Sequence, residues 1–356
     1  MTSPLARIHE EMGVRWGGGD PPLPRNYGAP EAEYAAARDS VAIVDRADRR
    51  FLRVHGRDPG RMIQGLITND VGLAGSGRAI YAAVLTAKGR MVADARVLRR
   101  GEDILLETDA GAAVPLADHL RRFVPPLFAR FEDVSDSVVC IGVHGPAAGS
   151  VLGAVLGVTL PGDPPEDSAV EAVLDDVQVT AIATAHAGGH GWDVLCPPDS
   201  AGRLWTRLVD AGARPMGHAT LDVLRIEAGR PRWGAELGES VIPLEAGLRE
   251  RAISETKGCY TGQEVIVRVL HRGHVNWHLR GVLVGDASAP PADAPLYRAD
   301  DGRQAGRITS AAWSPRHGQT IALAYVRREV VPPAELRLGA ADGAAVTVVA
   351  LPFTIP

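Results

Sequence analysis

The sequence predicts an α+β protein with more than one domain. Its 356 residues exceed what a single hydrophobic core usually organises, so two or three domains are expected. Segments typical of strands and helices alternate along the chain without the strict rhythm of a doubly wound sheet. Hydrophobic residues make up 46% and charged residues 23%, which is typical of a folded chain rather than a disordered one.

The first part of the chain predicts a mixed unit of strands and helices. A helix is expected over residues 31–38, and a strand over 51–56, where apolar and polar residues alternate. Asp58 and Pro59 supply an N-cap and a first-turn proline for a helix that ends near Leu66. Three strands (80–85, 91–98 and 103–107) and a helix over 112–123 complete this unit.

The middle of the chain continues the mixed pattern, and the tail changes character. In the middle we expect strands over 138–143 and 191–195 and helices over 201–211 and 219–228. From residue 281 on, short runs such as 303–309, 320–326 and 345–350 predict a strand-rich tail that forms a small terminal barrel or sandwich.

Charge, hydropathy and cysteine content exclude several classes of protein. The formal net charge of −5 argues against a general nucleic-acid binder and against a polybasic membrane binder. No apolar run approaches the roughly 18 residues that span a bilayer, and residues 1–13 lack the apolar core of a secretory signal. Cys140, Cys196 and Cys259 are odd in number and far apart, so no disulfide framework or structural zinc site is expected. We therefore predict a cytoplasmic protein without a bound metal.

The segment Lys-Gly-Cys-Tyr-Thr-Gly-Gln-Glu at 257–264 is the most distinctive candidate for chemistry. Thr261 and Glu264 have the spacing of a capping box, which predicts a helix from Gly262. Cys259 would then precede a helix N-terminus and stand two residues from Lys257, and both features favour a thiolate. For an isolated cysteine, a buried residue in a turn is the ordinary alternative.

Three further charged residues interrupt apolar segments. Asp94 and Asp193 lie within predicted strands, and Arg225 lies on a predicted helix. Taken singly, Asp94 and Asp193 are each expected to be solvated or salt-bridged rather than functional, with Asp94 on the solvent face of its strand. A surface charge is one interpretation of Arg225. The segment 271–278 holds three histidines, but Gly273 argues against the helix on which they could bind a metal.

Taken in order, several segments resemble the glycine-cleavage T-protein superfamily of tetrahydrofolate-binding proteins. These are residues 23–28, 33–38, 69–71, 89–94, 144–146, 191–193, 224–229 and 306–310. Segment 257–264 is similar to the signature of the YgfZ branch, which is linked to the maintenance of iron–sulfur proteins. The aminomethyltransferases of the superfamily have a related segment without the cysteine.

The resemblance implies a three-domain cloverleaf around a central folate site. It implies a discontinuous first domain (1–50 and 138–245), an inserted α+β domain (51–137), a signature segment bearing Cys259 (246–280) and a C-terminal β-barrel (281–356).

The resemblance also implies which residues bind tetrahydrofolate, or its 5,10-methylene or 5-formyl derivative. Asp94 matches an acid beside N5 of the folate, and Asp193 matches a glutamate that binds the pterin, although it is one methylene shorter. Arg225 matches an arginine of the folate pocket, Tyr81 matches an aromatic that lines it, and Trp233 replaces a tyrosine. A carboxylate can accept two parallel N–H groups of a pterin, and its flat ring suits aromatic walls.

As function, the resemblance implies a tetrahydrofolate-binding protein that supports the assembly or repair of iron–sulfur proteins. Its partners would be folate and iron–sulfur client or assembly proteins. Cys259, Lys257 and Asp94 would carry any chemistry, and whether the protein is an enzyme stays open.

Two alternatives stay open beside this interpretation. The first is a folate-dependent aminomethyltransferase, which would need a lipoyl carrier protein. The second is a tRNA-modification factor, suggested by a modest basic patch of Arg268, Arg272 and Arg280 with Trp277 as a stacking residue.

Overall fold

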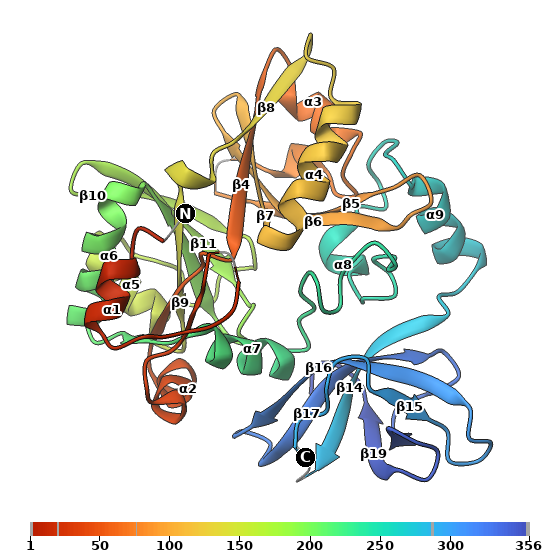
Figure 1. Ribbon diagram of the computed structural model, residues 1–356. Coiled ribbons are helices and arrows are strands. Elements are labelled where there is room, and N and C mark those ends of the chain that lie inside the picture. The colour runs from red at the N-terminus through yellow and green to blue at the C-terminus, as the bar shows by residue number, and fades with distance from the viewer. Residues whose placement is uncertain (1–2, 20, 76, 286–287, 354–356) are drawn as a thin grey trace. The chain divides into compact units, whose positions relative to one another are not determined.

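The computed structural model of the chain describes residues 3–19, 21–75, 77–285 and 288–353. It divides into two compact units, which are described separately below (Figure 1). Unit 1 consists of Met1–Gln64, Asp70–Tyr81 and Ala95–Leu224, and unit 2 of Gly65–Asn69, Ala82–Asp94 and Arg225–Pro356.

A six-stranded sheet forms the centre of unit 1. Its strand order is β10-β11-β12-β9-β3-β13, and all neighbours are antiparallel except β13 and β3. The strands are β3 (Ala42–Asp45), β9 (Val139–His144), β10 (Ala169–Leu174), β11 (Val177–Thr184), β12 (Gly191–Cys196) and β13 (Arg214–Pro215). Helices α5 (Ala148–Leu156) and α6 (Pro198–Asp210) pack on one face, where alternate side chains such as Trp192 and Val194 join their core.

The intervening side chains of these strands lie on the opposite face of the sheet. Because side chains alternate along a strand, Cys140, Ile182 and Leu195 face away from α5 and α6. They form a second core with Phe51 and Leu105 of the next sheet. Asp193 belongs to this face by its register, two residues before Leu195.

A five-stranded sheet has the order β5-β6-β7-β4-β8. Its strands are β4 (Arg49–Gly56), β5 (Ile80–Leu85), β6 (Met91–Arg100), β7 (Asp103–Asp109) and β8 (Ala129–Asp133), with helices α3 (Pro59–Gln64) and α4 (Ala110–Phe123). Asp109 caps α4, because its Oδ1 accepts a hydrogen bond from Gly111 N at 2.9 Å.

Unit 2 ends in a closed six-stranded barrel of order β14-β17-β16-β15-β18-β19 (Figure 1). Its strands are β14 (Trp277–Gly285), β15 (Pro295–Tyr297), β16 (Gln304–Ser314), β17 (Gln319–Arg327), β18 (Ala334–Leu338) and β19 (Ala344–Val349). Side chains such as Val282, Ala324 and Val326 fill the interior. The sequence predicted a small barrel or sandwich, and the barrel is confirmed.

The remaining elements are short. They are α1 (Ala6–Glu11), β1 (Arg15–Trp16), β2 (Pro24–Asn26), α2 (Pro30–Asp39), α7 (His218–Glu227), α8 (Arg249–Ala252) and α9 (Gln263–Arg272), with 3-10 turns at Val71–Leu73 and Ser135–Ser137. In the ranges described, no helix has the length and apolar character needed to cross a membrane.

Most predicted elements of the α+β fold are confirmed, with the ends shifted by a few residues. The predicted capping box is wrong: α9 begins at Gln263, one residue later than predicted, and its N-cap is Gly262, with no side-chain cap. Thr261 donates its backbone N–H to Gly65 O at 3.0 Å instead. Helix α5 was not predicted. The domain boundaries implied by the resemblance stay a prediction.

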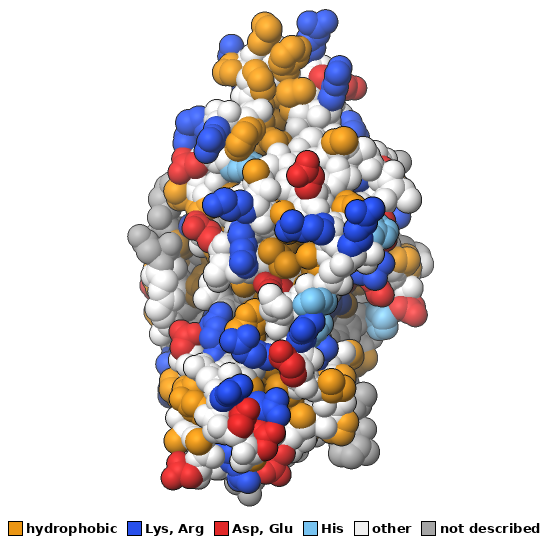
Figure 2. Space-filling view, turned by 90° about the vertical axis from the view of Figure 1, so that its right-hand side faces the viewer, with side chains coloured by type: hydrophobic (Ala, Val, Ile, Leu, Met, Phe, Trp, Pro, Cys, Tyr) orange, Lys and Arg blue, Asp and Glu red, His pale blue; other side chains and the backbone are white. Residues whose placement is uncertain are grey.

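Charged side chains of both signs lie on the surface (Figure 2). The face shown in Figure 2 carries Lys and Arg side chains interspersed with Asp and Glu.

Candidate functional site

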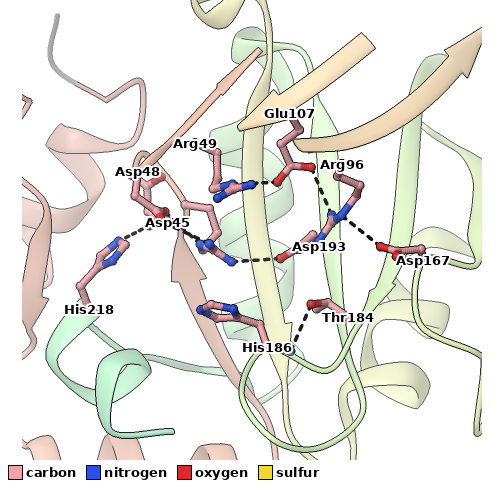
Figure 3. Close-up of polar contacts among 11 residues, drawn as sticks. Asp45, Asp48, Arg49, Arg96, Glu107, Asp167, Thr184, His186, Asp193 and His218 are labelled. Carbon is pink, nitrogen blue, oxygen red and sulfur yellow. Dashed lines mark hydrogen bonds and ion pairs between the residues drawn. The ribbon is translucent and has the colours of Figure 1, made fainter. Parts of the chain in front are cut away.

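Asp193 lies in a buried network of ion pairs within unit 1 (Figure 3). Its Oδ2 lies 2.6 Å from Nη2 of Arg96 on β6, and its Oδ1 lies 3.6 Å from Nη1 of Arg46. Of the two outcomes left open for Asp193, solvated or salt-bridged, the second is the one observed.

Arg96 connects three carboxylates. Besides Asp193, its Nη1 lies 3.2 Å from Oε2 of Glu107, and its Nε lies 3.4 Å from Oδ1 of Asp167 (Figure 3). Glu107 also accepts a hydrogen bond from Arg49 Nε at 2.9 Å. Because each buried carboxylate faces at least one guanidinium, the network offsets much of the cost of removing these charges from water.

The network controls the ionisation of its members. Burial opposes the charge on Asp193, but Arg96 and Arg46 outweigh it and hold its pKa below the usual value. Burial, aided by Asp193 and Glu107, raises the pKa of the Cys140 thiol. Burial also lowers the pKa of His144, at the end of β9, to about 4.

The same region brings three potential metal ligands together. The ligand atoms of Glu107, Cys140 and Asp193 lie within 4.8 Å of one another. Arg96 already pairs with both carboxylates, and the raised pKa keeps the thiol of Cys140 protonated. The cluster therefore favours ion pairs over a metal ion.

The network was missed by sequence reasoning. A signal exists, because Arg96 and Glu107 are cross-strand partners of β6 and β7, where opposite charges at one register attract. That register becomes visible only once the sheet is known.

Arg225 and Glu236 form a second buried ion pair, within unit 2. Nη1 of Arg225 lies 2.9 Å from Oε2 of Glu236, and Nη2 donates to Ser310 Oγ at 2.6 Å. Oε1 of Glu236 accepts hydrogen bonds from Ser310 and Thr309 of β16. The interpretation of Arg225 as a surface charge is therefore wrong, since its side chain is 1% exposed.

The signature segment 257–264 is held against residues 65–69 and 85–89 of unit 2. The Lys257 ammonium donates to Ile67 O at 2.8 Å and to Asn69 O at 2.9 Å, and it lies over the Tyr260 ring. Gly262 has a φ of +82°, and a Cβ there would lie 2.6 Å from Thr86 O. Only glycine fits this close approach without strain.

The three cysteines differ in exposure. Cys259 is exposed within this segment, whereas Cys140 on β9 and Cys196 on β12 are buried. The interpretation of Cys140 and Cys196 as ordinary strand cysteines is confirmed. Burial raises the pKa of Cys196 to about 11, so neither buried thiol is prepared for nucleophilic chemistry.

The other predicted site residues are buried. Asp94 on β6 and Tyr81 on β5 are each 6% exposed, and Trp233 is 9% exposed. The expectation that Asp94 lies on a solvent face is therefore wrong. A buried carboxylate interacts more strongly with a nearby cation than one in water.

Two family models match the chain in sequence. The GCVT N-terminal domain matches residues 7–257, and the glycine cleavage T-protein C-terminal barrel domain matches residues 278–354.

Individual relatives match over nearly the full chain. An aminomethyltransferase of Rubrobacter xylanophilus is 31% identical over 334 residues, covering 92% of this chain and 87% of the relative. An aminomethyltransferase of Bacillus subtilis is 25% identical over 339 residues, covering 92% and 91%.

A solved structure shares the fold. The glycine cleavage system aminomethyltransferase T of Bartonella henselae superposes with a TM-score of 0.88 at 22% identity, covering 99% of this chain and 98% of that one.

Proposed function

Because the chain belongs to the glycine-cleavage T-protein family, we propose that it is a folate-dependent aminomethyltransferase. The observation that carries the proposal is the 31% identity to an aminomethyltransferase over 92% of the chain. The substrates proposed are tetrahydrofolate and an aminomethyl group delivered by a lipoyl carrier protein. The one-carbon unit passes to the folate, ammonia and the free carrier thiol leave, and the 5,10-methylene derivative is the product. This function was the first alternative left open by the sequence.

Asp94 is the residue that we propose for the chemistry. Its carboxylate would lie beside N5 of the folate, where it can stabilise a cationic one-carbon adduct or move a proton. Its burial supports this role, because exclusion of water strengthens the interaction between a carboxylate and a developing cation.

The folate contacts proposed differ in how well the side chains suit them. Tyr81 and Trp233 offer aromatic walls for a flat pterin ring. Arg225 already pairs with Glu236, so its proposed role is to stabilise the conformation of the folate pocket. Asp193 fits only in part, because its Oδ2 accepts from Arg96 and its Oδ1 faces Arg46 at 3.6 Å, so a pterin N–H would share an oxygen that already faces a guanidinium.

Calorimetric titration with tetrahydrofolate tests the binding part of this proposal. The wild-type chain is expected to bind, and Asp193→Ala is expected to bind more weakly if its carboxylate meets the pterin. Unchanged affinity in a folded Asp193→Ala chain would leave Asp193 with the structural role alone.

A second candidate function is the support of iron–sulfur proteins by a YgfZ-type thiol. The observation that favours it is the exposed Cys259 in the turn that Lys257 anchors. Here Cys259 would act as a redox or transfer thiol, and Lys257 would position it. The relatives described above carry the aminomethyltransferase name, so this candidate stands second.

Replacing Cys259 separates the two candidates. In a strain that carries Cys259→Ala, iron–sulfur enzymes are expected to keep their activity under oxidative stress if aminomethyl transfer is the function. A loss of that activity, with the variant still folded, would favour the second candidate.

A further inference from the structure

A cavity of about 420 Å³ lies within unit 2, beside the barrel. Its volume is in the range of pockets that bind small organic ligands. It is lined by Ser240, Val241, Glu245, Trp277, Gln304, Gly306, Arg307, Tyr325 and Arg327. None of the residues proposed above for folate or for catalysis is among them.

The register of the barrel strands explains how one wall of this cavity is formed. Ala324 and Val326 point into the barrel core, so Tyr325 and Arg327 point out of it. Trp277 of β14 is the cross-strand partner of Arg327, and Arg307 of β16 is the partner of Tyr325. Three adjacent strands thus present two aromatic rings and two guanidinium groups on one outer face.

The segment around residues 236–245 closes the other side of the cavity. Tyr325 Oη donates to Glu236 O at 2.9 Å, and Leu279 N donates to Glu245 O at 2.9 Å. These contacts bury Tyr325 to 4% exposure although it points outward from the barrel. The wall is therefore fixed by hydrogen bonds on both sides.

The two arginines differ in how far their charge is already used. Arg307 pairs with Asp293 at 2.6 Å and lies 5.8 Å from the centre of the Tyr325 ring. Arg327 lies 4.8 Å from the centre of the Trp277 ring. In the described part of the chain, Arg327 makes no ion pair, so its guanidinium is available to a carboxylate.

Glu245 supplies the opposite charge. Its Oε2 lies 3.3 Å from Ile242 N and 3.8 Å from Nη1 of Arg90. Both contacts use the same oxygen, which leaves Oε1 for an N–H donor of a ligand. A carboxylate in the cavity also disfavours a ligand with two negative charges.

We propose that this cavity binds a planar aromatic carboxylic acid that also carries an N–H group. Its carboxylate pairs with Arg327, its ring packs along Trp277 and Tyr325, and its N–H donates to Glu245. This is a second ligand site, beyond the proposed aminomethyl transfer and independent of it.

Calorimetric titration of the full chain with three probes tests the ligand class. The chain is expected to bind 3-aminobenzoate most tightly and benzoate more weakly, and to show no heat with aniline. Arg327→Met removes the guanidinium at this exposed position but leaves an unbranched side chain. It is expected to weaken 3-aminobenzoate binding about tenfold or more. Arg303→Met removes an exposed arginine outside the cavity and is the matched control.

Three results would overturn the proposal. The first is the absence of aromatic carboxylate binding, and the second is an equal loss of affinity in both arginine variants. The third is displacement of 3-aminobenzoate by saturating tetrahydrofolate, because the cavity would then belong to the folate site. The expected result is an unchanged affinity for 3-aminobenzoate in the presence of tetrahydrofolate.

Discussion

Oδ2 of Asp193 lies 2.6 Å from Nη2 of Arg96, and both side chains are buried. The resemblance to folate-binding proteins implies that Asp193 binds the pterin. In the structure, however, its carboxylate pairs with the guanidinium of Arg96 on β6. A buried ion pair needs both of its members, because either one alone is an uncompensated charge out of water. Loss of Asp193 can therefore weaken folate binding through the fold as well as through the site.

Removal of Arg96 is expected to destabilise the chain strongly. Arg96→Met leaves Asp193, Glu107 and Asp167 without a shared cation, which should lower the free energy of unfolding by about 3–5 kcal/mol. Denaturant titration measures this. Arg53→Met is the control, because its ion pair with Asp103 is largely exposed and should contribute little. Similar small losses in both variants would show that the network contributes little to stability.

The free energy of unfolding is expected to begin to fall at a pH well above that at which carboxylates usually take up protons. Burial lowers the pKa of His144 from 6.5 to about 4, so the native state keeps its ring neutral. The unfolded chain binds the proton first, and stability is lost as pH falls from about 6.5 towards 4, by up to about 3 kcal/mol.

Unfolding free energies at pH 7 and pH 4.5 measure this loss. His144→Gln should flatten the slope, whereas His274→Gln, at an exposed position, should not change it. An unchanged slope in His144→Gln would mean that other groups cause the acid sensitivity.

One of the three thiols is expected to react with iodoacetamide in the native state. Cys259 is exposed, whereas Cys140 and Cys196 are buried and have raised pKa values. Mass spectrometry of peptides should find the label on Cys259, and on all three cysteines after denaturation. Comparable native labelling of the two strand cysteines would contradict the burial described above.

The two lysines of the chain offer a matched comparison. Lys257→Met removes the ammonium that donates to Ile67 O and Asn69 O, and it should lower the free energy of unfolding by about 2 kcal/mol. Lys88→Met, at an exposed position, should leave it unchanged. Equal effects on denaturant midpoints would mean that Lys257 does not anchor the segment.

Helices and strands could be predicted from the sequence where the spacing of apolar side chains within one segment is regular. The strand over 80–85 and the helix near 219–228 follow from side-chain spacing alone. Several buried polar contacts join distant residues: the ion pair of Arg96 with Asp193 spans 97 residues, and the hydrogen bond from Arg225 to Ser310 spans 85. Such partners cannot be inferred before the sheet order and register are known.

The capping of α9 failed for a different reason. The spacing of Thr261 and Glu264 fits a capping box, but Gly262 takes a left-handed conformation and becomes the N-cap. Thr261 is bonded to Gly65 instead, a contact across 196 residues of sequence. A local rule was overridden by the packing of the turn against the five-stranded sheet's β5–β6 hairpin.

Formation of methylenetetrahydrofolate from tetrahydrofolate and an aminomethylated lipoyl carrier protein tests the proposed function most directly. The wild-type chain is expected to form it, Asp94→Asn to form it about 100-fold more slowly or worse, and Cys259→Ala to keep the rate within about twofold. A wild-type chain that binds tetrahydrofolate in calorimetry but forms no methylenetetrahydrofolate would contradict the proposal.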